Sequence, residues 1–142
     1  MKHFLITGFI AGCLGAIILV MIMYILKAAG MGSPGFVGVY RAMIGSNPPV
    51  DEIIAAILFV ISGGIWGLIF CWLIKRPTVL KGILFGFLPT LWLWVVVNAV
   101  IGKPLFNGFA LKGIVMPLIF NMLIWGTFVG WYASRKVRAV IA

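Results

Sequence analysis

The sequence contains almost no acidic residues. Asp51 and Glu52 are the two acids among 142 residues and are outnumbered by eleven Lys and Arg residues, so the formal net charge is +9. Charged residues make up 9% and hydrophobic residues 64% of the chain, whereas soluble domains average about 25% and 45–50%. This composition excludes a disordered chain, which needs low hydrophobicity, and a conventional water-soluble enzyme. Cations spread between long apolar blocks are typical of a membrane protein whose loops face anionic headgroups, and not of a nucleic-acid binder.

Residues that commonly carry enzyme chemistry are also scarce. His3 is the single histidine, so one chain cannot build a His-based acid–base pair, a triad or a multi-His metal site. The apolar blocks carry no charged residue, although proton relays and cation-coupled carriers usually need one. Cys13 and Cys71 form no CxxC pair, so they indicate no metal or redox motif. The sequence therefore predicts a non-enzymatic protein without a bound metal.

Four apolar blocks are long enough to cross a membrane. A spanning helix needs about 20 mainly apolar residues, and the blocks that meet this requirement are 4–26, 53–74, 82–101 and 114–133. Runs such as Ile57 to Ile61 do not alternate between apolar and polar residues, as the strands of a membrane barrel would. Because lipid offers no hydrogen bonds to the backbone, the blocks should then be helices. We expect an all-α membrane protein in which residues 1–142 form a single domain of four transmembrane helices.

The longest connection, residues 27–52, has a possible helix of its own. Ser33 could cap a helix that starts with Pro34 in its first turn. The apolar residues that would share one helical face are Phe36, Val37, Tyr40, Met43 and Ile44. Two interpretations stay open: a short helix over 34–44 that lies in the membrane interface, or an irregular loop.

Every apolar block carries glycines at GxxxG or similar spacing. The pairs are Gly8 and Gly12, Gly63 and Gly67, Gly82 and Gly86, and Gly126 and Gly130. Small residues let helix backbones approach closely in lipid, where van der Waals contact drives association. These ridges either close the monomer only, or at least one of them faces outward and contacts a partner.

The second and fourth blocks resemble each other. Ile65-Trp66-Gly67 matches Ile124-Trp125-Gly126, and Arg76 then matches Arg135 at the same offset. This repetition suggests two tandem helical hairpins related by a pseudo-two-fold axis along the membrane normal. Chance similarity of Gly- and Trp-rich helices is the alternative.

Three tryptophans and two asparagines stand out inside the blocks. Trp66, Trp92 and Trp125 each lie ten or eleven residues from a cation at the block end, which is about 15 Å along a helix and near the middle of the membrane. Asn98 and Asn121 must find polar partners in hydrocarbon. These five residues are candidates for binding a carotenoid, chlorophyll, quinone or other lipid. The alternatives are packing bulk, helix-to-helix hydrogen bonds, or a contact face for another protein.

A family resemblance rests on the small residues. Gly8-Phe9-Ile10-Ala11-Gly12, Gly82-Ile83-Leu84-Phe85-Gly86, and Trp125-Gly126 through Gly130 resemble a group of uncharacterised four-helix bacterial membrane proteins of unknown function. The resemblance implies the four-helix layout and no activity. The Trp-, Phe- and Gly-rich helices also resemble those of cyanobacterial membrane proteins, so we expect a bacterial inner membrane or a cyanobacterial thylakoid.

Three hypotheses for function follow. The first is a non-enzymatic protein that acts by association, either as an accessory or assembly subunit of a membrane complex or as a homo-oligomer, so that its partners are lipids, other subunits or itself. The second is a binder or carrier of a lipophilic small molecule, and the third is an oligomeric channel or transporter. The first is favoured at this point, because a site without charged groups has little with which to orient a ligand.

The distribution of cations predicts the orientation of the chain. With four spans, the side that holds both termini and the middle loop carries Lys2, Lys75, Arg76, Lys81, Arg135, Lys136 and Arg138, and the other side carries Lys27, Arg41, Lys103 and Lys112. The positive-inside rule then places both termini in the cytoplasm. An Arg41→Cys variant should react with an impermeant thiol reagent from outside intact cells, and labelling of Thr78→Cys from outside would show the reverse orientation.

Overall fold

The computed structural model describes residues 1–141 and confirms an all-α protein with four helices long and apolar enough to cross a membrane. These spans are Lys2–Ala28, Val50–Leu73, Val79–Val100 and Leu111–Ile141. The fourth span runs well beyond the predicted range of 114–133, because the cationic tail, rich in good helix formers such as Arg, Lys and Ala, continues the helix. The second span begins before the predicted residue 53, so that both acidic residues lie in its first turn.

The first two spans are single helices and the last two are segmented. The first hairpin consists of α1 (Lys2–Ala28) and α3 (Val50–Leu73), with α2 (Gly35–Met43) between them. The third span contains α4 (Val79–Phe85), α5 (Phe87–Trp92), the π-helical η1 (Leu93–Val97) and α6 (Asn98–Val100). The turn η2 (Leu105–Phe109) leads to the fourth span. This span contains α7 (Leu111–Leu118), the π-helical η3 (Ile119–Gly126) and α8 (Thr127–Ile141).

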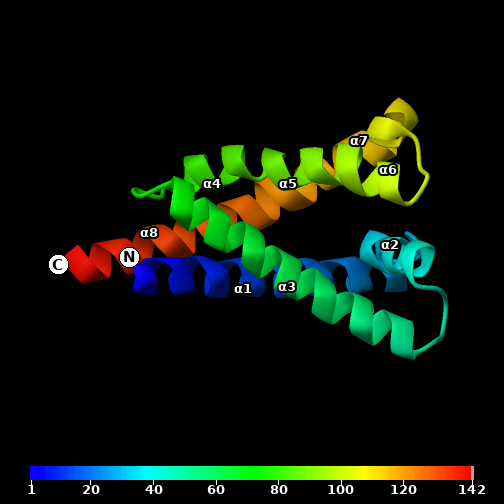
Figure 1. Cartoon of the computed structure of the whole chain (residues 1–142), viewed down its shortest axis with the longest axis horizontal. Coiled ribbons are helices and arrows are strands. Elements are labelled where there is room, and N and C mark those ends of the chain that lie inside the picture. Colours follow the sequence, from blue (N-terminus) through cyan, green and yellow to red (C-terminus); the bar gives the residue numbers. More distant parts are fainter. Residues whose placement is uncertain (142) are drawn as a thin grey trace.

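Both termini and the α3–α4 connection lie at one end of the molecule, which we call the terminal end (Figure 1). Helix α2 and the α6–α7 connection lie at the opposite end, which we call the α2 end. The two hairpins are close together near the terminal end, and their ribbons separate towards the α2 end. This arrangement follows from where the glycines of each hairpin lie.

Glycines bring α1 and α3 into backbone contact. A Cβ atom built at Gly8 would overlap the carbonyl oxygen of Gly67, and one built at Gly12 would overlap the carbonyl oxygen of Gly63. Cβ atoms at Gly63 and Gly67 would in turn meet α1. The two ridges of the first hairpin therefore face each other.

The second hairpin repeats this packing. A Cβ atom at Gly82 would overlap the carbonyl oxygen of Gly126, and one at Gly86 would overlap that of Asn121. Gly130 faces the carbonyl oxygen of Thr78. All eight predicted glycines thus pack helix against helix within the chain. The pseudo-two-fold relation between the hairpins stays a prediction.

Trp125 joins the two hairpins. Its ring packs against Gly15 of α1, its indole N–H donates to the Gly12 carbonyl oxygen over 3.2 Å, and its other neighbour is Phe85, with ring centroids 6.4 Å apart. The side chain is almost completely buried, at 3% exposure. A large aromatic body with one satisfied N–H is well suited to this position.

Proline explains the segmentation of the last two spans. Pro89 and Pro117 lack the N–H that would bond to the carbonyl four residues earlier. The chain leaves α4 at Gly86 before Pro89, and π-helical turns follow both prolines, in η1 and η3. Widened turns re-form backbone hydrogen bonds that proline disrupts, so both spans are interrupted between the glycine contact and the α2 end.

The connection between α1 and α3 contains a helix, α2, close to the predicted range of 34–44. Pro34 and not Ser33 is its N-cap, and no side chain caps it, so the expected serine cap is wrong. Val37 on its inner face is fully buried. Burial of this face against α3 compensates for the missing cap.

The glycine contacts give a prediction about stability. Gly12→Ala and Gly67→Ala should each destabilise the protein by roughly 1–3 kcal/mol, the usual range for overpacking. Gly38→Ala in α2 is the matched control, because a Cβ atom at Gly38 meets nothing within 4 Å. This control should be neutral or stabilising by up to about 1 kcal/mol from helix propensity. Thermal unfolding in one detergent measures all three, and equal midpoints would refute the packing.

Candidate functional site

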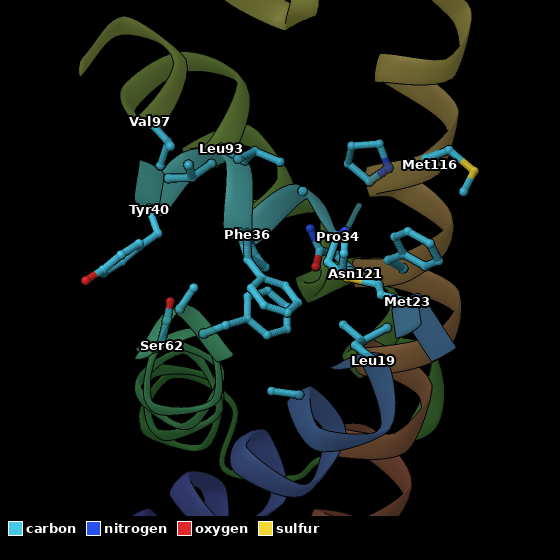
Figure 2. Close-up of a pocket in the computed structure, with 18 of the residues that line it drawn as sticks. Leu19, Met23, Pro34, Phe36, Tyr40, Ser62, Leu93, Val97, Met116 and Asn121 are labelled. Carbon is cyan, nitrogen blue, oxygen red and sulfur yellow. The ribbon is translucent and has the colours of Figure 1, made fainter. Parts of the chain in front are cut away.

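A cavity of about 780 Å³ opens between the two hairpins towards the α2 end. Its walls are built from α1, α2, α3, the α5–η1 segment and the α7–η3 segment. Figure 2 shows side chains of these elements around one space: Leu19 and Met23, Phe36 and Tyr40, Ser62, Leu93 and Val97, and Met116 and Asn121. Most of them are apolar, so the cavity offers an environment close to that of the lipid chains.

All five residues selected from the sequence as ligand candidates line this cavity. They are Trp66, Trp92, Trp125, Asn98 and Asn121. They come from three different spans. Trp66 and Trp125 are far apart in the sequence, and the packing of the two hairpins places both at the same cavity. Among the predicted packing glycines, Gly63 also reaches the lining.

Trp66 and Trp92 form the wall between the cavity and the outer surface. Their ring centroids lie 6.2 Å apart in an edge-to-face arrangement, and Trp92 is 51% exposed. Both rings also border a shallow groove on the outer surface, with Leu88, Leu91, Val95 and Val96. The backbone of α3 packs against α1 and α2, with no comparably close packing against α5 or η1. The two indoles therefore stand between the cavity and the lipid-facing surface.

Asn121 places an amide in the otherwise apolar wall. Its Nδ2 donates to the Thr90 hydroxyl over 3.1 Å, and Thr90 donates to the Gly86 carbonyl oxygen over 3.0 Å. Within residues 1–141 no hydrogen bond engages the side-chain oxygen of Asn121. This oxygen is available to a polar group of a bound molecule.

Asn98 hydrogen-bonds to the connection that follows its helix. Its side chain is nearly buried, at 2% exposure, and its Nδ2 donates to the Pro104 carbonyl oxygen and to Asn107 Oδ1, over 3.2 and 3.0 Å. Asn107 Nδ2 then donates to the Gly113 carbonyl oxygen over 2.8 Å, and Trp94 donates to the same oxygen over 3.2 Å. Asn98 thus borders the cavity mainly by holding the α6–α7 connection in place.

This connection has an unusual backbone. Phe106, Asn107 and Phe109 have left-handed conformations, with φ of 52°, 52° and 58°. Non-glycine residues seldom adopt this conformation, and groups of them are held by surrounding contacts. The Phe106 ring lies between Trp94, tilted against it at a centroid distance of 5.5 Å, and Phe109, stacked on it at 5.6 Å. The dipeptide Asn107-Gly108 is typical of turns, and Gly108 also has a positive φ of 64°, but no local signal marks Phe106 or Phe109.

The turn carries two cations to the cavity. Lys103 and Lys112 flank it and both contribute to the lining. The expectation of a site without charged groups is therefore wrong. The four apolar blocks contain no charged residue. The two lysines of the lining lie outside these blocks, on either side of the turn between the third and fourth spans.

Helix α2 forms the outer wall and is fixed by stacking and charge. Phe36 stacks on Phe59 of α3, with centroids 4.9 Å apart. Arg41 Nε lies 2.6 Å from Asp51 Oδ2, and the Asp51 side chain has no exposed surface. The hydrogen bond to Asp51 raises the pKa of Arg41 above its usual value, so this pair is charged throughout the physiological range.

A second ion pair lies beside the first. Lys27 Nζ is 2.9 Å from Glu52 Oε1, and the Tyr24 hydroxyl donates to Glu52 Oε2 over 3.2 Å. Both acidic residues of the sequence are thus used to join α1, α2 and α3. The sequence carries no local signal for this role, because the partners Lys27 and Arg41 lie on two other elements, α1 and α2.

The Arg41–Asp51 pair gives a prediction about α2. Arg41→Gln removes the positive partner of a buried carboxylate, so α2 should separate from α3 more often. Hydrogen exchange of the α2 amides should speed up several-fold, while exchange in α8 stays unchanged. Arg138→Gln in α8 is the control with the same loss of charge. Unchanged exchange of α2 would show that stacking of Phe36 alone holds the helix.

Comparison with known proteins adds no relative. No protein-family model matches the chain, and neither the curated proteins nor the solved structures include a significant match.

Proposed function

We propose that this protein binds an amphipathic, lipophilic molecule of the membrane in the cavity between its two hairpins. The observation that carries the proposal is the convergence of Trp66, Trp92, Trp125 and Asn121 on one cavity of about 780 Å³. Small-molecule sites are typically apolar concavities of about 300–1,000 Å³ with a few well-placed polar groups. The cavity matches this description in size and in lining.

The lining suits a ligand with an apolar body. Trp66 and Phe120 belong to the partly buried apolar surface around the core, and Leu19 is nearly fully buried beneath it. Asn121, Ser62 and Tyr40 contribute polar side-chain oxygens to the same lining. A molecule with one polar group and a long apolar portion satisfies both kinds of surface, as a quinone, a pigment or a lipid would.

The position of Trp66 and Trp92 suits access from the bilayer. Both rings line the cavity and the groove on the outer surface, so rotation of these two side chains would connect the two spaces and admit an apolar molecule already dissolved in the membrane. Such a route avoids transfer through water, which is costly for apolar surface.

Assembly with other membrane subunits has less support as the primary role. The eight glycines that could have formed an outward ridge are in contact within the chain, so an interface would need another surface. A binding protein also fits the scarcity of reactive groups, because binding requires no proton transfer or nucleophile.

We further propose that the termini are cytoplasmic and the α2 end faces outward, in a bacterial inner membrane or a thylakoid. The excess of cations near the terminal end supports this orientation. The cavity would then open within the outer leaflet.

The proposal can be tested by filling the cavity. Ser62 of α3 lines the cavity, whereas its neighbour Ile61 does not and is exposed on the same helix. Ser62→Trp should therefore lower the amount of lipophilic molecule that co-purifies with the protein at least several-fold, and Ile61→Trp should not. Native mass spectrometry followed by organic extraction measures the bound molecule and the oligomeric state together.

Equal ligand content in both variants would contradict the proposal. So would a wild-type protein from its native membrane that carries no small molecule after mild detergent extraction but retains a stoichiometric protein partner. That second result would favour the accessory-subunit hypothesis.

A further inference from the structure

We infer that the ligand has an anionic headgroup, held by Lys103 and Lys112 at the mouth of the cavity, and that it is an anionic phospholipid of the surrounding bilayer. This inference rests on the proposed function and adds the chemical class of the ligand. It is carried by the charges at the cavity and by the way the connection that bears them is built.

The two lysines have no acidic side chain to neutralise them. The sequence contains two acids, Asp51 and Glu52. Asp51 pairs with Arg41, and Glu52 pairs with Lys27. Lys103 and Lys112 are therefore two positive charges beside a mainly apolar cavity, and like charges placed together attract an anion from their surroundings.

The connection that carries the lysines is rigidly organised. The backbone N–H of Lys103 donates to the Asn98 carbonyl oxygen over 2.8 Å. Next to Lys112, the Gly113 carbonyl oxygen accepts from both Asn107 and Trp94. The left-handed turn between the lysines is thus fixed at three points, and an anion at this site would meet two cations whose backbones are already in position. Preorganisation of this kind reduces the entropy cost of binding.

The arrangement of charge and apolar surface matches the polarity of a lipid. The cations lie at the α2 end, and the indole of Trp125 lies deeper, between the hairpins. Lysine side chains can keep their charged ends at the headgroup level while their stems cover apolar surface. A lipid phosphate would therefore meet the lysines while an acyl chain extends towards Trp125.

The apolar cavity distinguishes a lipid from a soluble anion. A free phosphate or a small carboxylic acid would use the two lysines but would leave the apolar cavity empty. Lys and Arg side chains near a membrane surface attract anionic lipids, so the two lysines favour an anionic over a zwitterionic lipid.

The test compares two lipids with identical acyl chains. Purified protein is equilibrated with equal amounts of phosphatidylglycerol and phosphatidylcholine, and bound lipid is counted by native mass spectrometry. Wild-type protein should prefer phosphatidylglycerol by about ten-fold at low salt, and added salt should weaken the preference. The Lys103→Gln/Lys112→Gln variant should lose it. The Lys75→Gln/Arg76→Gln variant, with the same change of charge at the terminal end, should keep it.

Two further measurements separate the outcomes. The Lys103→Arg/Lys112→Arg variant keeps both positive charges and should retain the preference. Loss of the preference in the Gln variant is then due to the missing charge and not to misfolding. Inorganic phosphate at the same concentration as the lipid should not displace it, and displacement would overturn the assignment to a phospholipid.

Failure of this inference differs from failure of the proposed function. If wild-type protein retains both lipids equally and Ser62→Trp loses both, the cavity binds lipid but the lysines do not select it, so the inference is wrong. If wild-type protein retains neither lipid but another lipophilic molecule co-purifies with it and is lost in Ser62→Trp, only the inference fails. If it retains no lipophilic molecule at all, the inference and the proposed function both fail.

Discussion

Backbone contact at glycine is the constraint on which the structure depends. Gly12 against Gly63 in the first hairpin, and Gly82 against Gly126 in the second, place helix backbones closer than any side chain would permit. These contacts fix each hairpin, and Trp125 then joins the two by donating its N–H to the carbonyl oxygen of Gly12. Beyond them the helices are free to separate towards the α2 end, and the cavity occupies that space.

The separation is maintained by elements that a regular four-helix bundle lacks. The π-helical turns after Pro89 and Pro117 bend the second hairpin, and α2 is held over the other side by Phe36 and the Arg41–Asp51 pair. Tight packing in one half therefore coexists with an open, mainly apolar space in the other. Such a division is expected of a protein that must be stable and also accommodate a molecule.

The sequence was sufficient for the helices and for part of the site. Length and hydropathy predicted the four spans, and the spacing of Gly8 and Gly12 indicated a close contact, because both signals are local. The lysines at the cavity and the role of Asn107 were not predictable. They depend on left-handed conformations at Phe106 and Phe109, which the Asn107-Gly108 turn signal does not predict, and on contacts between residues distant in the chain.

The central claim is that a lipid chain occupies the cavity, and fluorescence of Trp125 tests it most directly. A variant that retains Trp125 alone, with the other five tryptophans changed to Phe, is reconstituted with phospholipid whose acyl chains carry bromine, a contact quencher. Trp125 is 3% exposed, whereas Trp72 is 62% exposed on the outer surface, so a Trp72-only variant is the reference for surrounding lipid. The account predicts that brominated lipid quenches Trp125. Ser62→Phe fills the cavity without adding a second indole and should abolish this quenching. Unquenched Trp125 beside fully quenched Trp72 would contradict it.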